Sequence, residues 1–374
     1  MAVPFVQQFK VGKYIFGQKL KRNKRYPLVL MLEPLFRCNL ACAGCGKIDY
    51  PEHILDKRLS YDDCMAAIEE CGAPIVSIAG GEPLIHKEMD QIVSGFIERG
   101  KFVYLCTNAL LLERNMDKYT PSPYLTFSVH LDGNRDRHDA SVCRKGVFDK
   151  CVKVIEKALK KNFRVTVNCT LFQGESPEEV AEFMDDMMEL GVEGVTISPG
   201  YWYERAPRQD VFLKRLGSKN LFRKIFALGK GKKWRFNQSS LYLDFLAGNQ
   251  TYHCTPWGNP TRNVFGWQKP CYLLVGEGYA SSFQELMEET PWEQYGTGVN
   301  PKCSDCMVHS GYEATAVNDT MNKPLKALKV FLNGPRTEGE MAPEVPFVYE
   351  DEKDTNLVLE KITDNTKCDK KKVA

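Results

Sequence analysis

Residues 28–46 read LVLMLEPLFRCNLACAGCG, an apolar run followed at once by a loop with three cysteines. A short, near-continuous apolar run is typical of a strand in a parallel sheet that is covered on both faces. Similar runs recur through the first 200 residues. The sequence therefore predicts buried strands at 28–32, 75–79, 102–106, 125–131, 165–171 and 194–198.

Helix signals lie between these strands. One helix is expected to begin at Ser60 and end at Gly72, and another carries an apolar stripe through Phe148, Val152, Ile155 and Leu159. A third should begin after Ser176, with a proline and acids in its first turn. Six alternating units predict an α/β fold, a partial (β/α)6 TIM-like barrel, because a closed barrel of this kind needs eight.

Composition divides the chain further. We expect the barrel over 27–235, a cysteine-containing C-terminal domain over 236–333, and a polar, flexible tail over 334–374. The 374 residues carry 50 basic and 48 acidic side chains, a balance that argues against a nucleic-acid binder. No apolar run is long enough for a membrane span or a secretory signal, so we expect a cytoplasmic protein with reduced cysteines.

The first 26 residues differ from the rest, with seven Lys or Arg residues and no acid. Apolar residues are interleaved with these charges. Such a basic amphipathic segment can lie on the anionic inner face of a membrane. It can equally be a solvated arm that packs on its own domain, and the sequence leaves both readings open.

The three cysteines, Cys38, Cys42 and Cys45, follow the first predicted strand. Their thiolates can bind three irons of one [4Fe–4S] cluster and leave the fourth iron open to a small molecule. Zinc is the alternative, but structural zinc normally takes four ligands. With this spacing, the chain resembles the radical S-adenosylmethionine (SAM) enzymes, in which SAM occupies the open iron. Gly44 departs from that family, which often has an aromatic residue there.

Further residues match the family's SAM site in order along the chain. Gly80, Gly81, Glu82 and Pro83 resemble its GGEP motif, which binds the methionyl amino group. The glycines let the backbone approach a ligand, and the glutamate can pair with an ammonium group. Other strand ends fall where the family contacts ribose and adenine. This resemblance implies SAM contacts from Asn108, Ser128, His130, Asp132 and Ser198, although the histidines could be ordinary core residues.

Cys106 ends the third predicted strand, at the rim where barrel enzymes place their chemistry. A thiol there could give a hydrogen atom to a substrate radical. The alternative is a buried structural cysteine, which is the commoner fate of this residue type.

A second cysteine set consists of Cys254, Cys271, Cys303 and Cys306. Four thiolates could hold a second [4Fe–4S] cluster or a structural zinc ion. The spacing of this set also resembles the auxiliary-cluster extensions of radical SAM enzymes, although those often carry more cysteines.

Whole segments at 26–50, 103–109, 254–258 and 306–317 resemble one narrower family, the bacterial adenosylhopane synthases of hopanoid biosynthesis. The resemblance implies addition of a 5′-deoxyadenosyl radical to the terminal alkene of diploptene, a triterpene, with Cys106 as hydrogen-atom donor. It also implies an electron donor such as flavodoxin or ferredoxin. Trp202, Trp234, Trp257 and Trp267 could line an apolar tunnel or be ordinary core. The alternatives are a radical SAM maturase of peptides and a non-catalytic metal-binding scaffold.

Overall fold

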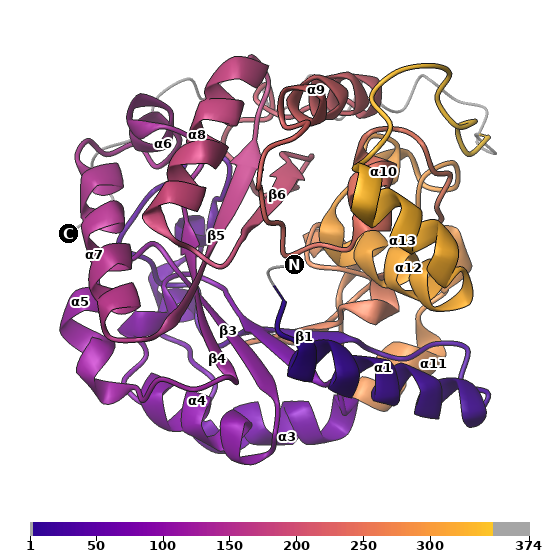
Figure 1. The fold of residues 1–374 in the computed structure, drawn as a ribbon. Coiled ribbons are helices and arrows are strands. Elements are labelled where there is room, and N and C mark those ends of the chain that lie inside the picture. The colour runs from indigo at the N-terminus through magenta and orange to yellow at the C-terminus, as the bar shows by residue number, and fades with distance from the viewer. Residues whose placement is uncertain (1–2, 347–374) are drawn as a thin grey trace.

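The structure is a computed structural model that describes residues 3–346. Its nine-stranded sheet has the order β6-β5-β4-β3-β2-β1-β7-β8-β9. The first six strands are parallel and curl into an open barrel with helices outside (Figure 1). The predicted α/β fold and six strands are confirmed. These strands are β1 Val29–Glu33, β2 Ile75–Ile78, β3 Phe102–Thr107, β4 Leu125–His130, β5 Arg164–Leu171 and β6 Val195–Pro199.

Helices connect the strands and cover the outer face of the barrel (Figure 1). The predicted helix starts are confirmed, because Ser60 and Ser176 each accept a hydrogen bond from the backbone three residues on. The longer helices here are α3 Tyr61–Cys71, α4 Met89–Glu98, α7 Val147–Lys160 and α8 Pro177–Leu190, and the shorter ones are α2 Glu52–Leu55, α5 Leu112–Asn115 and α6 Arg135–Ser141.

The buried face of α7 differs from the predicted stripe. Val147, Cys151, Val154 and Ala158 are its fully buried line, together with Ile155. The predicted members Phe148, Val152 and Leu159 lie at the edge of this face and are partly exposed. The helix is therefore rotated by about one residue from the expectation, because small Cys and Ala side chains allow closer approach to the sheet.

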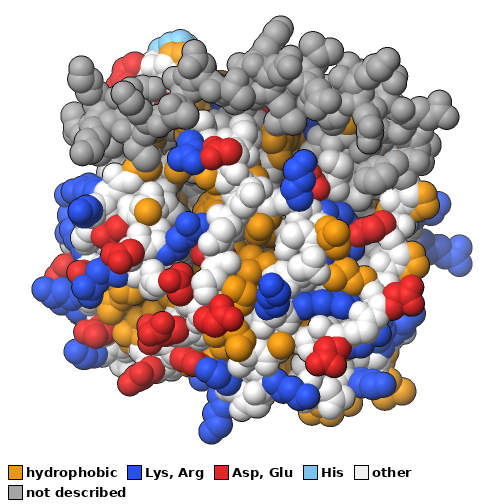
Figure 2. Space-filling model, turned by 90° about the horizontal axis from the view of Figure 1, so that it is seen from above, with side chains coloured by type: hydrophobic (Ala, Val, Ile, Leu, Met, Phe, Trp, Pro, Cys, Tyr) orange, Lys and Arg blue, Asp and Glu red, His pale blue; other side chains and the backbone are white. Residues whose placement is uncertain are grey.

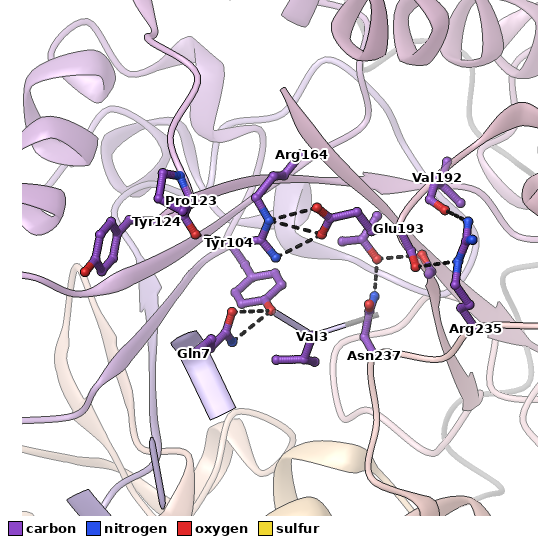
Figure 3. Close-up of polar contacts among 12 residues, drawn as sticks. Val3, Gln7, Tyr104, Pro123, Tyr124, Arg164, Val192, Glu193, Arg235 and Asn237 are labelled. Carbon is purple, nitrogen blue, oxygen red and sulfur yellow. Dashed lines mark hydrogen bonds and ion pairs between the residues drawn. The ribbon is translucent and has the colours of Figure 1, made fainter. Parts of the chain in front are cut away.

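The inner face of the strands carries polar side chains. Thr126, Ser128 and Thr166 are buried although each has a hydroxyl. Asn237 donates to the Thr166 hydroxyl from the chain that follows β6, and Figure 3 shows Asn237 beside the neighbouring strands. The near-continuous runs of the sequence therefore hide an alternation, with apolar side chains under the helices and polar ones inside the barrel.

The C-terminal half continues the same sheet. Strand β7 pairs in parallel with β1, and β8 and β9 follow in antiparallel order. Helix α11 packs on β8 and β9, and α10 packs against α9, α12 and α13 (Figure 1). The elements are α9 Arg215–Leu228, α10 Ser240–Leu246, β7 Thr261–Asn263, β8 Gly266–Gln268, β9 Tyr279–Ala280, α11 Phe283–Glu289, α12 His309–Asn322 and α13 Pro324–Asn333.

The predicted tail begins as a packed segment. Glu344 pairs with Arg215 and Lys219 of α9, and the Ala342 backbone donates to Gly248. Val345 is buried. Residues 334–346 thus pack on the body of the protein, and the rest of the predicted tail, 347–374, lies outside the described residues.

The N-terminal segment forms helix α1, Phe5–Leu20, which begins at the amino-terminal ends of the barrel strands. Gln7 donates to the Tyr104 hydroxyl at 2.9 Å, close to the Arg164–Glu193 ion pair of β5 and the loop before β6 (Figure 3). The helix thus packs on its own domain, as one of the two readings predicts. Among residues 3–346, no helix is both long and apolar enough to span a membrane.

Candidate functional site

The three cysteines of the first motif lie together on the loop after β1. Cys38, Cys42 and Cys45 are each partly exposed, and none forms a disulfide. The loop turns tightly, with the Cys45 backbone donating to Cys42. Burial raises the pKa of all three thiols, that of Cys38 to about 12. A bound metal would offset this cost by stabilising the thiolates.

The glycine motif after β2 packs against this cysteine loop. The backbone of Gly81 donates to Leu35 and that of Glu82 donates to Arg37, each at 2.9 Å. A Cβ atom at Gly81 would lie 2.1 Å from the Arg37 carbonyl oxygen, and Gly80 has φ +103°. Only glycine fits both positions, so the sequence pair fixes how closely the two loops approach.

Glu82 is buried and ties the motif to β3. Its carboxylate accepts hydrogen bonds from the Thr107 hydroxyl and the Asn108 backbone at 2.9 Å, and from the Leu84 backbone at 3.1 Å. Burial raises the pKa of Glu82 to about 7, against the effect of these donors. The Glu82 side chain therefore joins its own turn after β2 to the end of β3 and to the residue that follows β3. Pro83 opens the short 3-10 turn that follows.

Asn108 connects β3 to the cysteine loop. Its side-chain amide donates to the Asn39 side chain at 2.7 Å and lies 3.8 Å from Cys38 Sγ. The next residue, Ala109, has φ 61°, a conformation that side chains other than glycine rarely adopt. Strain of this kind is held only where surrounding contacts fix it, and it is commonest at functional sites.

Cys106 lies on β3 and is partly exposed. Its Sγ is 3.5 Å from the Ser77 hydroxyl on β2, and it also contacts Ser128 on β4, its partner in register. Burial raises the pKa of the Cys106 thiol, and the two serines offset only part of this. The sulfur therefore carries its hydrogen at neutral pH.

Asp132 has protein partners on both oxygens. Oδ1 accepts from the Thr170 backbone at 2.9 Å, and Oδ2 accepts from the Ser141 hydroxyl at 2.9 Å and lies 2.8 Å from His130 Nε2. Burial opposes the charged forms of Asp132 and His130, but their pairing outweighs it, so the pKa of Asp132 is lowered and that of His130 is raised. In this structure Asp132 orients His130.

Ser198, at the end of β6, is buried and reaches across to the C-terminal half. Its hydroxyl lies 3.1 Å from His309 Nδ1 at the start of α12. Burial lowers the pKa of His309 to about 4, so its ring is neutral. This contact connects the barrel rim to the domain that carries the second cysteine set.

Phe172, which sequence reasoning missed, occupies the space beside Gly44. A Cβ atom built at Gly44 would lie 3.2 Å from the Phe172 ring and 3.8 Å from the Phe212 ring. Phe172 follows β5 directly, so an aromatic ring from another strand end lies beside Gly44. The only sequence signal is an aromatic residue directly after a strand.

Sequence reasoning also missed a buried ion pair next to the first motif. Lys47 Nζ lies 2.8 Å from Glu33 Oε2, and both side chains are almost fully buried. Lys47 also lies over the rings of Phe36 and Tyr203. A lysine two residues after Cys45 could have drawn notice, but its partner at the end of β1 is visible only in the fold.

The second cysteine set converges in the C-terminal half. Cys254, Cys271, Cys303 and Cys306 all line one cavity, beside Tyr295 and Tyr312 among others. Burial raises the pKa of each thiol, and all but that of Cys303 are raised further by neighbouring cysteines. The fold thus brings cysteines that are up to 52 positions apart to one cavity, as expected if they bind one metal centre.

The donor sets suit an iron–sulfur cluster. Each offers thiols that are not in disulfides, and the first adds a glycine-lined approach and an amide directed at sulfur. Among the described residues no three His, Cys, Asp or Glu side chains converge tightly enough to hold a single metal ion. Cluster cysteines bind different irons and need not meet at one point.

Three of the four tryptophans considered for a tunnel are packing residues. Trp267 is buried against Phe283, and Trp257 packs edge-on against Trp292. Trp234 donates to Asp185 of α8. They therefore belong to the core and the helix layer.

Comparison with known proteins places these features in a family. Residues 32–187 match the radical SAM superfamily, and residues 195–330 match a domain of unknown function, DUF3463. The chain is 25% identical to GTP 3′,8-cyclase of Clostridium perfringens over 155 residues, 40% of this chain and 48% of that protein. It is 29% identical to Fe-coproporphyrin III synthase of Methanosarcina barkeri over 140 residues, 35% of each chain. The chain thus spans about half or less of the length of these curated relatives.

Among solved structures, Streptococcus suis SuiB bound to its precursor peptide SuiA superimposes with a TM-score of 0.60 and 15% identity, over 80% of this chain and 74% of that one. A second SuiB structure gives the same TM-score at 16% identity, over 80% and 75%. At such identity the likeness concerns the fold alone. The superfamily match covers the cysteine loop, the glycine motif and Cys106, and it implies a [4Fe–4S] cluster and SAM. Residues 32–187 of this chain therefore form a domain of the radical SAM superfamily.

Proposed function

We propose that this protein is an adenosylhopane synthase, a radical SAM enzyme that joins the 5′-deoxyadenosyl group to diploptene. The observation that carries the proposal is Cys106, a protonated thiol on β3 two residues before Asn108, whose side chain contacts the cysteine loop. The segments that resemble adenosylhopane synthases add support. Those segments include Cys106 itself.

The reaction needs two external electrons. One is used to cleave SAM, and the other is used to reduce the thiyl radical at the end. One electron cleaves SAM to methionine and the 5′-deoxyadenosyl radical, which adds to the terminal carbon of the alkene. The C=C π bond breaks, a C–C bond forms, and a tertiary carbon radical remains. The Cys106 thiol gives this carbon a hydrogen atom and becomes a thiyl radical. A second electron and a proton, from an electron donor such as flavodoxin or ferredoxin and from solvent, restore the thiol.

The chain's own groups prepare these steps. Cys38, Cys42 and Cys45 would hold the cluster, which supplies the electron for SAM cleavage when bound. The Gly80–Pro83 turn and Asn108 would hold SAM beside it. Phe172 offers a ring for adenine in place of the residue missing at position 44. Burial keeps Cys106 protonated, and a hydrogen-atom donor needs its S–H bond intact.

Cys254, Cys271, Cys303 and Cys306 would hold a second iron–sulfur cluster. Their shared cavity in the described structure supports this assignment. Zinc is the competing occupant, since four thiolates also suit it.

The test is anaerobic incubation of the reconstituted protein with SAM, a reductant and diploptene in detergent. We expect adenosylhopane, identified by mass, together with methionine. If 5′-deoxyadenosine accumulates without an adenosylated triterpene, the substrate is wrong, and a peptide maturase becomes the better reading. If SAM is not cleaved and the protein holds zinc without iron, the protein is a metal-binding scaffold.

A further inference from the structure

The large apolar side chains that are exposed in residues 3–346 are concentrated in α1, in α13 and at the end of α12. Ten of the thirteen lie in α1, at the end of α12 or in α13, and Leu216, Leu228 and Val299 are the others. Phe5 is 79% exposed and Leu325 is 81% exposed. A surface with this many exposed apolar side chains commonly binds a protein or a membrane.

The exposed side chains of α1 form one stripe. Phe5, Phe9, Phe16 and Leu20 fall within an arc of about 60° when each residue turns the helix by about 100°. Ile15 is buried on the other side, where it packs with Tyr26 and Ala314. The helix therefore has two apolar faces. One is used in packing on the domain, and the other has no cover in the described structure.

Helix α13 presents a second stripe. Leu325, Leu328, Phe331 and Leu332 are exposed, whereas Ala327 is buried against the body of the protein. The sequence did not suggest this helix as a surface. Its exposed leucines lie in a short helix that carries Lys326 and Lys329 and no acid.

The two helices meet at the end of α12. Lys19, next to exposed Leu20, donates to the Asn322 side chain at 2.7 Å. Asn322 is three residues before Leu325. Helix α1 packs on α12 through Ile15 and Ala314, and α13 contacts α12 directly. Both helices lie on the same half of the molecule in Figure 1, away from α6, α7 and α8.

The basic side chains around the exposed apolar stripes of α1 and α13 indicate an anionic partner. The segment before residue 27 has seven basic side chains and no acid, and residues 320–333 have three lysines and no acid. Asp319 pairs with two of those lysines, Lys323 and Lys326. By contrast, Figure 2 shows a face on which basic and acidic side chains are interspersed. Apolar side chains bordered by lysine and arginine match the interface of an anionic lipid bilayer.

We propose that α1 and α13 together form one docking face for an anionic membrane surface. The face lies at the end of the barrel opposite Cys106, because Gln7 and Lys10 contact Tyr104 and Tyr124 near the amino-terminal ends of β3 and β4. The face would therefore anchor the protein from the end of the barrel away from Cys106. The proposal depends on exposed apolar side chains and charge, and not on the substrate proposed above.

Vesicle co-sedimentation with the full chain tests the face. The vesicles contain phosphatidylcholine with or without phosphatidylglycerol. We expect binding that needs the anionic lipid and weakens at high salt. Phe9→Ser/Phe16→Ser in α1 and Leu325→Ser/Leu332→Ser in α13 should each weaken binding about tenfold or more, since each removes two inserted side chains. The matched control is Leu216→Ser/Leu228→Ser in α9, which should bind like the unchanged protein.

Circular dichroism and the thermal midpoint will show that the variants fold, since all six positions are exposed. The proposal is overturned if the unchanged protein does not bind anionic vesicles, or if the α13 variant binds equally well. Light scattering that shows a dimer abolished by the same substitutions would also overturn it, because a second copy would then cover the face. Vesicle binding without adenosylhopane formation in detergent would instead reject the proposed substrate and leave the face intact.

Discussion

At the scale of single residues, the site depends on groups held in one protonation state by burial. Cys106 keeps its hydrogen and His309 stays neutral, because burial disfavours their charged forms and neither has an oppositely charged hydrogen-bond partner among the described residues. The neighbours of Cys106 are the hydroxyls of Ser77 and Ser128, which are uncharged contacts that orient the sulfur without ionising it.

Replacing Cys106 with alanine separates radical formation from its quench. We expect Cys106→Ala to consume SAM but to give little adenosylhopane, or a mixture of epimers at the quenched carbon, since no S–H bond then faces the substrate radical. Mass spectrometry and NMR of the products check this. Cys64→Ala, in the buried face of α3, is the matched control and should keep the product pattern. Unchanged yield and stereochemistry in Cys106→Ala would remove the donor role.

Glu313 of α12 should make stability depend on pH. Its Oε1 accepts from the Ser239 backbone at 2.7 Å, and Oε2 has no hydrogen-bond partner among the described residues. Burial raises the pKa of Glu313 to about 7 from the ordinary value of 4.5. The native protein therefore binds this proton more tightly than the unfolded chain, and the free energy of unfolding falls as pH rises from about 4.5 to about 7.

We expect Glu313→Gln to flatten this fall in the metal-free protein, measured by urea unfolding at several pH values. Glu338→Gln, at an exposed position, serves as control and should keep the slope. Buried Glu82 contributes a slope of the same sign, so a remainder is expected in the Glu313 variant. A slope equal to that of the unchanged protein would contradict the assignment to Glu313.

At the scale of elements, the site is two loops held against each other by backbone hydrogen bonds. The cysteine loop after β1 and the glycine turn after β2 share two such bonds, and Glu82 extends the connection to β3. Parallel neighbouring strands bring their carboxyl ends to the same edge, which is why Leu35 meets Gly81 and Arg37 meets Glu82 there, although they are far apart in sequence.

Adding one methyl group at this junction should disrupt it. We expect Gly81→Ala to lower the thermal midpoint and the iron content after reconstitution, because its Cβ would lie 2.1 Å from a carbonyl oxygen. Gly217→Ala in α9 is the matched control. Nothing lies within 4 Å of its Cβ, so it should raise stability by about 0.5–1 kcal/mol. Normal iron content in Gly81→Ala would show that the loops can separate without loss of the site.

At the scale of the whole molecule, the C-terminal half is built onto the barrel. Strand β7 extends the sheet next to β1, the strand that leads into the first cysteine loop, and Cys254 and Cys271 lie on either side of the β7–β8 hairpin in sequence. A second connection between the two halves joins Ser198 at the end of β6 to His309 at the start of α12. The two cysteine sets therefore lie on parts of the chain that one continuous sheet connects.

Iron analysis tests whether each of the two cysteine sets holds a cluster. We expect about eight irons per chain after anaerobic reconstitution, and about four in Cys254→Ala/Cys271→Ala, since one [4Fe–4S] cluster holds four. Cys64→Ala/Cys71→Ala, with both positions in α3, should keep the full content. About four irons in all three proteins would leave the C-terminal cavity to zinc or to no metal.

The sequence by itself determined the six-strand pattern, the helix starts at Ser60 and Ser176, and the spacing of the first three cysteines. Each of these is local, because an apolar run, a cap or a short loop acts over a few residues. The rotation of α7 was misjudged because packing against the sheet, rather than hydrophobicity alone, selects the buried face.

Only the tertiary structure decided which distant groups meet. It placed Phe172 beside Gly44, Ser77 beside Cys106, and four C-terminal cysteines around one cavity. It also joined α1 to the end of α12, beside α13. These contacts depend on how strand ends and helix faces are arranged in space. No local pattern encodes that arrangement, because the free energy that selects it comes from packing the whole chain around a shared core.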